Sequence, residues 1–481
     1  MKLLLVGHDD RFAIEQLQLQ LFPNEKMEPA FAPFSGDGAV SSLSRGKDFL
    51  TASAMISYGG KTAKATRRLR LESETHSMRR RILQQAYFAA AAQLLEKAPA
   101  WGTLSGVRPT KITTKHLLSG GTARSANRLL RETFFVCPER RALCIDASEA
   151  TVESISLLEP QDVSVYIGIP FCPTRCAYCS FVSVGIEKFS GMLDTYLQAL
   201  LREIEHTGRL LKESGRRIRT LYIGGGTPTT LSTSQMKVLM EAIRTHFDLS
   251  GLIEYTVEGG RPDTLDEEKL RTIRSFGCDR MSINPQTMND SVLSCIGRRH
   301  TTQQTLDAFE AAKRAGFEGI NMDLIAGLPQ ETVESYIESL KCVIALDPSN
   351  ITVHTLAMKK GADLFFDRFQ LPSGKDVETM LELGTGLLRA AGYRPYYLYR
   401  QKYMTGSFEN VGWCRAGFLG LYNIYMMEEL HTIISLGGGG MTKVNYPDGH
   451  LERFHNPKFP KEYIERIDDV LKQKDEVFAL L

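Results

Sequence analysis

From about residue 160 onward, short apolar runs alternate with longer stretches whose apolar residues recur every three or four positions. The short runs predict buried strands, and the longer stretches predict amphipathic helices, as in the spacing of Leu193, Leu197 and Leu200. Strands that alternate with helices in this way build a parallel sheet with right-handed crossovers. The predicted strands cover residues 163–169, 219–223, 254–257, 280–283, 319–325 and 351–356.

The helix boundaries in this part of the chain carry recognisable signals. Ser232 with Gln235, and Thr264 with Glu267, have the spacing of capping boxes, which predicts that helices begin there. Asp347, which is followed by a proline, predicts a helix end. An open doubly wound sheet and a partial barrel both fit this order of elements.

Polar residues follow the predicted strands. The first strand leads into a loop that contains cysteines, and the second leads into the run Gly-Gly-Gly-Thr-Pro at 224–228. The third and fourth strands end near Glu258 and near Asn-Pro-Gln at 284–286, and the fifth and sixth carry Asp323 and His354. Such groups would be costly inside a packed sheet unless they share a cavity that holds ligands. This pattern therefore favours a curved partial barrel around one site.

Residues near these strand ends have side chains suited to a charged ligand that carries a ribose. Glu258 and Asp323 can accept hydrogen bonds from hydroxyl or ammonium groups, and Arg298 can bind a carboxylate through two parallel hydrogen bonds. Gln286 adds an amide, and the glycines at 224–226 let a ligand approach the main chain closely. Each residue alone fits an ordinary structural or surface role, but together they indicate a binding site.

The loop after the first predicted strand, residues 168–181, reads Gly-Ile-Pro-Phe-Cys-Pro-Thr-Arg-Cys-Ala-Tyr-Cys-Ser-Phe. Cys172, Cys176 and Cys179 stand four and then three positions apart, so three thiolates can converge on one metal centre, which suits an iron–sulfur cluster. The position two beyond Cys179 is Phe181, so we expect one iron to be open to a non-protein ligand. The alternatives are a zinc knuckle, which would need a fourth Cys or His close by, and a chance group of structural thiols.

The segments on either side of this region predict further elements. The basic run at 79–81 either binds an anionic partner or lies on the outer face of a helix. Arg108 and Lys111 flank a proline turn, and they are either solvated charges at a helix entry or a carboxylate clamp.

The N-terminal and C-terminal segments also predict helices and strands. The predicted elements are a strand at 2–6, a helix at 11–21, a hairpin over 49–71 that turns at Gly59 and Gly60, a helix at 78–97, a helix at 377–391, a strand at 393–400 and a helix and strand over 426–436.

Composition limits the classes of protein that fit. A chain of 481 residues is long for one core, so we expect at least two domains. The charged residues make up 24% and the formal net charge is +2, which gives no indication of a nucleic-acid partner, and we expect none. Nine cysteines are too few for a disulfide scaffold. The first apolar run is too short for a signal peptide, and no run approaches the ~20 apolar residues of a membrane span. We therefore expect a protein of the reducing cytoplasm.

The cysteine spacing, after a strand that ends in Tyr-Ile-Gly-Ile-Pro-Phe, resembles that of the radical S-adenosylmethionine (radical SAM) enzymes. Further motifs are similar to those of the oxygen-independent coproporphyrinogen III oxidase (coproporphyrinogen dehydrogenase) family, and Leu-Ser-Gly-Val-Arg-Pro-Thr-Lys at 104–111 resembles its HemZ branch. The motifs are Gly-Gly-Gly-Thr-Pro at 224–228, Val-Glu at 257–258, Ser-Ile-Asn-Pro-Gln at 282–286, Ile-Gly-Arg-Arg-His-Thr at 296–301 and Asn-Met-Asp-Leu-Ile-Ala-Gly-Leu-Pro at 321–329.

The resemblance implies an α/β protein with a partial (β/α)6 TIM-like barrel at 156–375, an N-terminal α+β extension at 1–155 and a C-terminal mixed α/β region at 376–481. It implies that Cys172, Cys176 and Cys179 hold a [4Fe–4S] cluster whose open iron is chelated by SAM, with one or two SAM molecules bound. No catalytic side chain is implied beyond this cofactor site. The positions that match the family's SAM-binding residues are Tyr166, Tyr178, Gly225, Gly226, Thr227, Glu258, Gln286, Arg298, Asp323, Ala357 and Met441.

The implied activity is the oxygen-independent conversion of coproporphyrinogen III to protoporphyrinogen IX in porphyrin and heme biosynthesis. In this family a 5′-deoxyadenosyl radical takes a hydrogen atom from the β-carbon of a propionate, and loss of CO2 and one electron leaves a vinyl group. The implied partners are a tetrapyrrole and a reductant protein such as flavodoxin or ferredoxin, and we expect a monomer.

Two departures from the family pattern leave the substrate open. The best-studied members carry a further cysteine where Phe181 stands, and their usual Gly-Val-Gln is Asn-Pro-Gln at 284–286. Members without that cysteine include heme-binding chaperones, so the alternatives are a chaperone, a radical SAM enzyme that acts on heme and a structural zinc protein. A group of C-terminal tyrosines either stacks on the tetrapyrrole plane or packs an aromatic strand against the barrel. These are Tyr393, Tyr396, Tyr397, Tyr399 and Tyr403.

Overall fold

The chain divides into two compact units, Met1–Ile145 and Asp146–Leu481. The division falls inside helix α5 (Pro138–Ile155). The domain boundaries implied by the resemblance, near residues 155 and 375, stay a prediction. The computed structural model describes residues 1–23, 25–180, 183–357, 370–400 and 408–481, with residues 187–190 described by their backbone alone.

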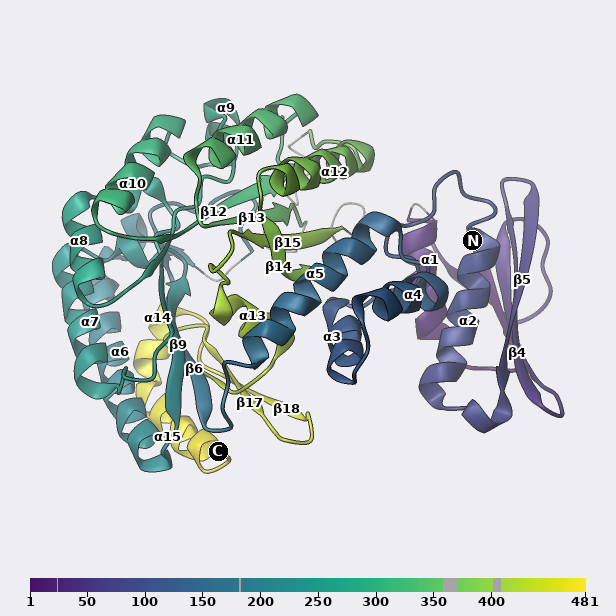
Figure 1. Cartoon of the computed structure of the whole chain (residues 1–481), viewed down its shortest axis with the longest axis horizontal. Helices are drawn as coiled ribbons and strands as arrows, with labels where there is room; N and C mark the ends of the chain where they lie inside the picture. The colour runs from purple at the N-terminus through teal and green to yellow at the C-terminus, as the bar shows by residue number, and fades with distance from the viewer. Residues whose placement is uncertain (24, 181–182, 358–369, 401–407) are drawn as a thin grey trace. The chain divides into compact units, whose positions relative to one another are not determined.

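The N-terminal unit is built on a five-stranded sheet in the order β2-β1-β3-β4-β5. Strand β1 pairs in parallel with β2 and β3, whereas β3, β4 and β5 are antiparallel neighbours. Helices α1 and α2 pack on one face of this sheet, where Leu17, Ile56 and Leu83 share a buried core (Figure 1). The elements are β1 (Lys2–Val6), α1 (Arg11–Leu21), β2 (Glu28–Ala30), β3 (Gly38–Arg45), β4 (Phe49–Tyr58), β5 (Lys61–Arg70), α2 (His76–Ala91), α3 (Thr110–Leu118) and α4 (Ala123–Phe134).

Most of the elements predicted for this unit are confirmed. The first strand, the first helix and the hairpin that turns at Gly59 and Gly60 lie where the pattern placed them. Helix α2 ends at Ala91 and not at residue 97, because the next amide groups make tighter turns, such as the bond from the Leu94 N–H to the Ala91 carbonyl (2.9 Å). Part of the basic run serves the unit itself, since Arg79 and Arg80 both lie beside the Asp10 carboxylate.

The second unit contains an 11-stranded sheet whose centre is the six predicted strands, which lie parallel in the order β6-β9-β10-β11-β12-β13. Figure 1 shows helices following one another along the outside of this curved sheet. The strands are β6 (Asp162–Ile169), β9 (Arg217–Gly225), β10 (Glu254–Glu258), β11 (Arg280–Ser282), β12 (Gly319–Ala326) and β13 (Asn350–Thr355). The helices that follow them are α6 (Ile186–Ser214), α7 (Thr233–His246), α8 (Glu267–Ser275), α9 (Asp290–Cys295), α10 (Thr302–Arg314) and α11 (Val333–Leu346).

The C-terminal part of the chain extends both edges of the parallel sheet. Strand β15 (Glu409–Cys414) runs antiparallel to β13 and carries β14 (Arg394–Arg400), after helix α12 (Gly374–Ala390). On the opposite edge, β16 (Ile433–Leu436) runs parallel to β6 and carries β17 (Met441–Asn445) and β18 (Leu451–His455). Because other strands continue both edges, β6 and β13 do not pair, and the barrel is partial as predicted.

Local helix signals explain most boundaries of the second unit. Ser232 and Gln235 form the predicted capping box of α7, and Asp347 ends α11 in the left-handed conformation. The second predicted capping box is wrong. Helix α8 begins two residues later, because Asp266 accepts the hydrogen bond from the Lys269 amide, whereas Thr264 belongs to a short 3-10 turn. Among the described residues, we find no helix with both the length and the hydropathy needed to cross a bilayer.

A buried ion pair links α6 to the C-terminal helix α15 (Ile467–Phe478). The Lys474 ammonium lies 3.1 Å from the Glu203 carboxylate, and the two side chains are 1% and 0% exposed. The same carboxylate accepts hydrogen bonds from the Gly437 amide (2.8 Å), from the Asn456 side chain (2.9 Å) and from the Tyr463 hydroxyl. These bonds fix the glycine turn after β16 against α6.

Replacing Lys474 by Met is expected to lower the free energy of unfolding of the second unit by about 3–5 kcal/mol, because the Glu203 carboxylate would stay buried without its cation. Lys472→Met, on the exposed side of the same helix, is the matched control and should change it by less than about 0.5 kcal/mol. Urea unfolding followed by Trp413 fluorescence, in a Trp101→Phe background, measures both. Equal effects of the two substitutions would contradict the role of the pair.

Candidate functional site

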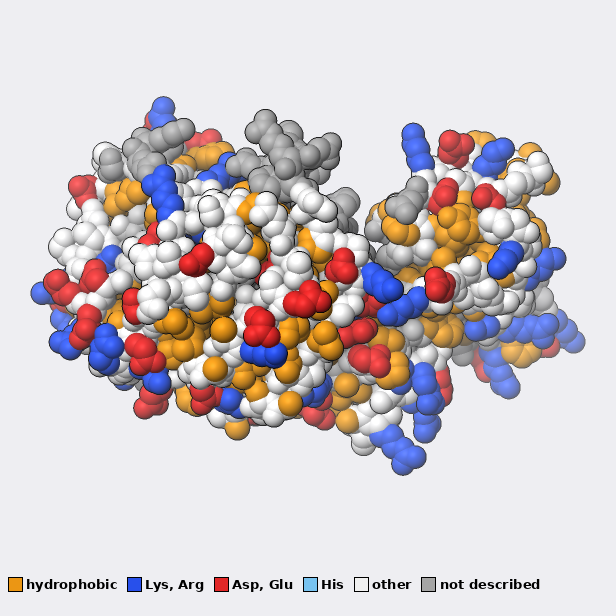
Figure 2. Space-filling model, turned by 90° about the horizontal axis from the view of Figure 1, so that it is seen from above, with side chains coloured by type: hydrophobic (Ala, Val, Ile, Leu, Met, Phe, Trp, Pro, Cys, Tyr) orange, Lys and Arg blue, Asp and Glu red, His pale blue; other side chains and the backbone are white. Residues whose placement is uncertain are grey.

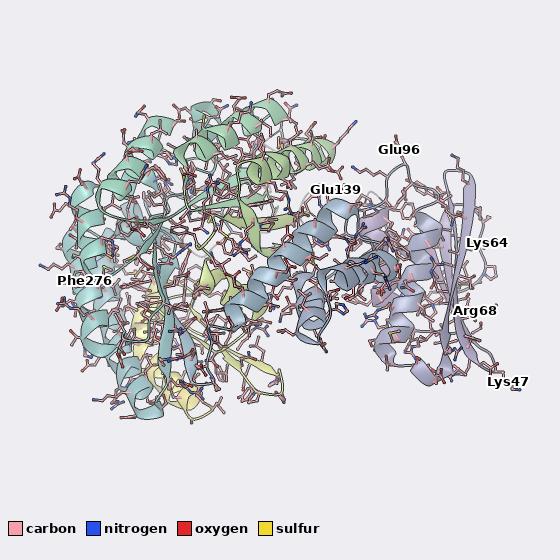
Figure 3. All side chains as sticks on the ribbon, in the orientation of Figure 1. Lys47, Lys64, Arg68, Glu96, Glu139 and Phe276 are labelled. Atoms are coloured by element: carbon pink, nitrogen blue, oxygen red, sulfur yellow. The ribbon has the colours of Figure 1, made fainter. Side chains whose placement is uncertain are left out.

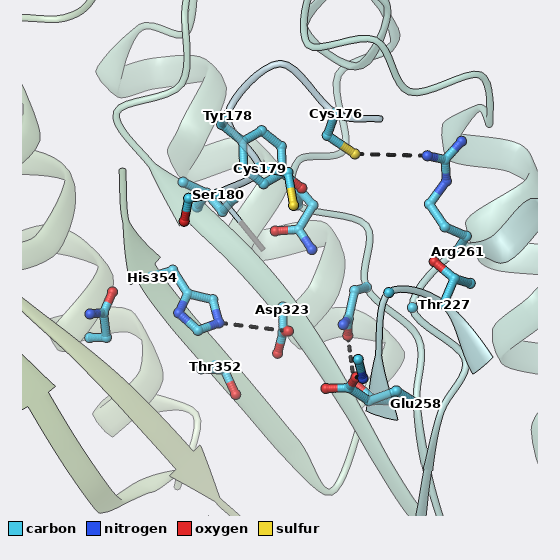
Figure 4. Close-up of a pocket in the computed structure, with 18 of the residues that line it drawn as sticks. Cys176, Tyr178, Cys179, Ser180, Thr227, Glu258, Arg261, Asp323, Thr352 and His354 are labelled. Carbon is cyan, nitrogen blue, oxygen red and sulfur yellow. Dashed lines mark hydrogen bonds and ion pairs between the residues drawn. The ribbon is translucent and has the colours of Figure 1, made fainter. Parts of the chain in front are cut away.

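The carboxyl ends of the parallel strands open on a cavity of about 340 Å3. Its wall combines the cysteine loop after β6, the ends of β9 to β13, and residues of β14, β15 and α13 (Leu421–Glu428) from the C-terminal part. Figure 4 shows side chains of these elements pointing into one space. The predicted site residues that line it are Cys172, Cys176, Tyr178, Cys179, Gly225, Gly226, Thr227, Glu258, Gln286, Arg298, Asp323 and Ala357.

Two predicted site residues lie outside the described lining of this cavity. The Tyr166 ring stacks on the ring of Tyr222, which does line the cavity, with 6.1 Å between centroids. Met441 begins β17, where its carbonyl accepts a hydrogen bond from Ser435 (2.8 Å). The glycine turn before Met441 packs on Gly168 at the start of the cysteine loop, since a Cβ at Gly437 would lie 2.3 Å from the Gly168 carbonyl oxygen. Met441 therefore follows a turn that supports the loop, and Tyr166 lies one ring behind the cavity wall.

Polar groups surround the cysteine thiols. The Thr227 hydroxyl lies 3.5 Å from the Cys172 sulfur, and the Arg261 guanidinium lies 3.8 Å from the Cys176 sulfur. Burial raises the pKa of the Cys176 thiol, but the charges of Arg298 and Arg261 outweigh burial and bring that pKa below its ordinary value. Within the described ranges, no three His, Cys, Asp or Glu side chains are grouped closely enough to hold a metal ion. The assignment of the three cysteines as metal ligands therefore stays a prediction.

The surroundings of the loop fit an anionic group held by thiolates. Two buried arginines, Arg261 and Arg298, line the same cavity as the thiols. The Nε–H of Arg298 is buried and has no hydrogen-bond partner within the described part of the chain. A Cβ at Gly226 would lie 2.9 Å from the Cys172 sulfur, so only glycine lets the backbone come this close to the loop. Cationic donors, a bare backbone and three thiols are a donor set that suits an iron–sulfur cluster.

The glycine segment after β9 is tied to the cysteine strand by its own backbone. The amide of Gly226 donates to the Ile169 carbonyl (2.9 Å), and the amide of Thr227 donates to the Phe171 carbonyl (2.7 Å). Gly225 has a φ of +120°, a conformation that L side chains rarely adopt. A Cβ at Gly224 would lie 2.7 Å from the Glu258 carboxylate. Glycine is therefore required both for the turn and for the approach to its neighbours.

Two carboxylates in the cavity have pKa values that are shifted in opposite directions. Burial raises the pKa of Glu258 to about 7, although the Tyr222 hydroxyl donates a 2.6 Å hydrogen bond to it. The pKa of Asp323 lies below its ordinary value, because the hydrogen bonds and charge of His354 and the hydrogen bond of Asn321 outweigh burial. The site thus keeps one ionised acid beside one that changes protonation near neutral pH.

Asp323 belongs to a chain of polar contacts that reaches the C-terminal strands. The His354 imidazole lies 3.6 Å from the Asp323 carboxylate, as Figure 4 marks, and its other nitrogen lies 3.4 Å from the Tyr399 hydroxyl. Asn321 donates to the second carboxylate oxygen (2.7 Å) and accepts from Thr352 (3.0 Å). The orientation of Asp323 is therefore fixed from both sides.

The aromatic C-terminal strand divides its tyrosines between core and cavity. Tyr396 and Tyr397 are both buried in a cluster with side chains of α13, and Tyr397 also lines the cavity, where its ring stacks on that of Tyr399 at 6.2 Å. Tyr393 is buried and donates a hydrogen bond to the Pro348 carbonyl. Tyr403 lies outside the described residues. Tyr393 and Tyr396 therefore pack as the second alternative expects, whereas stacking of Tyr397 and Tyr399 on a tetrapyrrole stays a prediction.

Several residues of the cavity were not predicted from the sequence. Arg261 stands three residues after Glu258, and the rule that polar groups gather at strand ends could have identified it. Tyr222 lies inside a strand and carries no such signal. The C-terminal contributors come from segments whose place beside β13 is a property of the tertiary fold. These are Asn410, Asn423 and Met427.

Comparison with known proteins identifies relatives of this arrangement. The family model described as "Radical SAM superfamily" matches residues 166–343. The oxygen-independent coproporphyrinogen-III oxidase-like protein HemZ of Bacillus subtilis is 39% identical over 389 residues, which cover 79% of this chain and 77% of that protein. The heme chaperone HemW of Haemophilus influenzae is 30% identical over 304 residues, which cover 63% of this chain and 76% of that protein.

A solved structure matches the fold. The structure of coproporphyrinogen III oxidase (HemN) from Escherichia coli, described as a radical SAM enzyme, superposes with a TM-score of 0.54. The match covers 67% of this chain and 73% of that chain at 23% sequence identity, so it bears on the fold alone. It confirms the predicted fold class.

Glu258 is expected to make the stability of the second unit depend on pH. Its pKa rises from 4.5 in the unfolded chain to about 7 in the folded one, so the folded state binds more protons between these values. The free energy of unfolding, relative to that of Glu258→Gln, should therefore fall by about 1–3 kcal/mol as the pH rises from 4.5 to 7.5. Urea unfolding at both pH values measures this difference, and a constant difference would contradict the raised pKa.

Proposed function

Because this chain belongs to the HemZ branch of the oxygen-independent coproporphyrinogen-III oxidase-like family, within the radical SAM superfamily, we propose that it oxidatively decarboxylates coproporphyrinogen III to protoporphyrinogen IX. The observation that carries this proposal is the single cavity in which three cysteines, a bare glycine segment and the polar strand ends meet. The family implies a [4Fe–4S] cluster and SAM.

In this proposal Cys172, Cys176 and Cys179 hold the cluster, and the polar strand ends hold SAM. When bound, the cluster and SAM together supply a 5′-deoxyadenosyl radical that removes a hydrogen atom from the substrate. Arg261 lies on the Cys176 side of the cavity, where its charge stabilises anionic sulfur ligands. The residues of the chain supply binding, orientation and exclusion of water, since the cofactors carry the bond-breaking chemistry.

The SAM-binding role rests on the shape and charge of the strand ends. The glycine segment at 224–226 exposes main chain that a ligand can approach, and Arg298 offers an unpartnered buried N–H to a carboxylate. Asp323 is ionised and oriented, so it can accept hydrogen bonds from ribose hydroxyls. Gln286 adds an amide on the same wall. These groups suit an amino acid joined to a nucleoside.

The C-terminal part supplies the proposed tetrapyrrole contacts. Tyr397 and Tyr399 present parallel rings to the cavity, a geometry suited to a flat macrocycle. Asn423 and Met427 of α13 line the same space. A substrate held against these side chains would share one enclosed cavity with the proposed SAM-binding residues, which keeps the radical chemistry away from bulk water.

A heme chaperone is the second candidate. The relative HemW is 30% identical and is named for that role, and Phe181 replaces the further cysteine of the best-studied oxidases. The same aromatic wall would then bind heme without converting it. The third alternative, a radical SAM enzyme that acts on heme, would consume heme in the presence of SAM and a reductant.

Anaerobic reconstitution with iron and sulfide, followed by SAM, a reductant and coproporphyrinogen III, is expected to give 5′-deoxyadenosine and a product lighter by two CO2 and four hydrogen atoms, read by mass spectrometry. Cys176→Ala should lose the brown cluster absorbance and both products, because a thiolate ligand is missing. Cys342→Ala, at an exposed cysteine away from the cavity, is the matched control and should keep them.

The outcomes separate the candidates. If deoxyadenosine forms without a decarboxylated product, the substrate assignment is overturned, but the assignment as a radical SAM enzyme stands. Tight heme binding without deoxyadenosine would favour the chaperone. Colourless, iron-free protein after reconstitution, or SAM cleavage by Cys176→Ala, would overturn the cluster assignment.

His354 is expected to act as a positioning residue for Asp323. Replacement of His354 by Gln should raise the Kd for SAM by about tenfold, which corresponds to ~1.4 kcal/mol, because Asp323 loses its oriented partner. Equilibrium dialysis with reconstituted protein measures the Kd, and the cluster spectrum should not change. His450→Gln, on the exposed surface, is the control. An unchanged Kd in His354→Gln would contradict the positioning role.

A further inference from the structure

The two units of the chain carry opposite charge. Residues 1–145 contain 22 Lys and Arg against 12 Asp and Glu, whereas residues 146–481 contain 36 against 44. The near neutrality of the whole chain, from which we predicted no nucleic-acid partner, thus combines a strongly basic unit with an acidic one. A basic unit of this kind attracts polyanions, so the prediction has to be made again for the N-terminal unit alone.

Helices α1 and α2 cover only one face of the N-terminal sheet. The opposite face carries alternate residues of each strand, and strands β1, β3, β4 and β5 place no acidic residue on it. Figure 3 shows Lys64 and Arg68 pointing away from α2, and Figure 2 shows Lys and Arg side chains gathered at this end of the unit. The outward residues of β5 are all exposed, and they are Thr62, Lys64, Thr66, Arg68 and Arg70.

The row of cations on β5 lies at an exposed edge of the sheet. Edge strands often carry lysine to block pairing with other chains, and β5 is an edge strand. The inward-facing Arg67 is used structurally, since its guanidinium stacks on the Phe135 ring at 5.7 Å. Within the described residues, however, neither Lys64 nor Arg68 forms an ion pair, whereas Arg70 pairs with the exposed Glu72 at 3.3 Å. Two cations that face solvent on the same side of β5, with Thr66 between them, are therefore available to an anionic partner.

The neighbouring strand places apolar and hydroxyl groups beside these cations. Phe49 pairs across from Arg70 and Met55 pairs across from Lys64, and both apolar side chains are 38% exposed. Ser53 and Thr66 form a cross-strand hydroxyl pair between them (3.1 Å). Side chains on one face of a strand recur about every 7 Å. The face thus offers a regular row of cationic and hydroxyl donors next to an exposed aromatic ring.

We infer that the uncovered face of the N-terminal sheet binds single-stranded nucleic acid. Its row of donors on β5 would contact successive phosphates, and Phe49 would stack on a base, which is how sheet surfaces and open grooves bind single strands. RNA and DNA share this chemistry. An acidic protein would satisfy the cations but would leave the exposed ring and the hydroxyl row unused, so the observations favour the nucleic acid.

Fluorescence anisotropy with the full-length chain and labelled 20-nucleotide oligouridine or oligothymidine tests this. We expect binding that weakens with salt. The variant K64S/R68S/R70S should bind at least about tenfold more weakly at 50 mM salt, and the slope of log K against log salt should decrease by about 2. Phe49→Ala should weaken binding at least about fivefold without changing that slope. Comparing the affinities for oligouridine and oligothymidine shows whether RNA or DNA is preferred.

The variant K115S/R124S/R128S removes the same charge from exposed positions on α3 and α4 and serves as the matched control. It should keep most of the affinity, and circular dichroism checks that all variants are folded. Equal weakening by the two triple variants would overturn the assigned face. No binding at 50 mM salt, or displacement of the oligonucleotide by polyglutamate at equal charge, would overturn nucleic acid as the ligand.

Discussion

Backbone hydrogen bonds join the ends of two parallel strands, β6 and β9. The Gly226 amide donates to the Ile169 carbonyl, and the Thr227 amide donates to the Phe171 carbonyl. The cysteine loop begins at the end of one strand, and the glycine segment forms the end of the other. Because no side chain separates them, the first cysteine lies directly beside the hydroxyl of Thr227. Any group held by the thiols is then within reach of a ligand held by the glycines. The proposed site depends on this contact.

The charged side chains around that contact differ in their surroundings and protonation. Two buried arginines face the thiols, and one buried arginine nitrogen has no partner among the described residues. Further along the wall, Asp323 stays ionised while Glu258 titrates near neutrality. A cation beside a thiol whose pKa it lowers, and an ionised acid beside one that titrates near neutral pH, are different electrostatic environments within one cavity. Such a cavity can hold an anionic cluster and a zwitterionic ligand next to each other.

Much of this arrangement could be predicted from the sequence, and each prediction that failed has a physical cause. The apolar runs and the polar residues at their ends are local signals, so the parallel strands and most of the cavity wall could be predicted. The end of α2 and the start of α8 depend on which of several nearby groups wins a hydrogen bond, as Asp266 does over Thr264. Asn410 and Asn423 enter the cavity through long-range pairing of C-terminal segments, which periodicity does not encode.

The C-terminal part completes the site at both edges of the sheet by different means. At one edge, β15 and α13 place side chains in the cavity itself. At the other edge, the glycine turn after β16 packs on Gly168, and the Tyr196 hydroxyl bridges the two by donating to the Gly168 carbonyl and accepting from the Gly438 amide, both at 2.7 Å. The buried pair of Glu203 and Lys474 holds that turn in place. Strand β6 thus pairs on both sides and is braced at its last residues, just before the cysteine loop. The glycine run before Met441 therefore supports the start of the cysteine loop, while the role of Met441 itself in binding SAM stays a prediction.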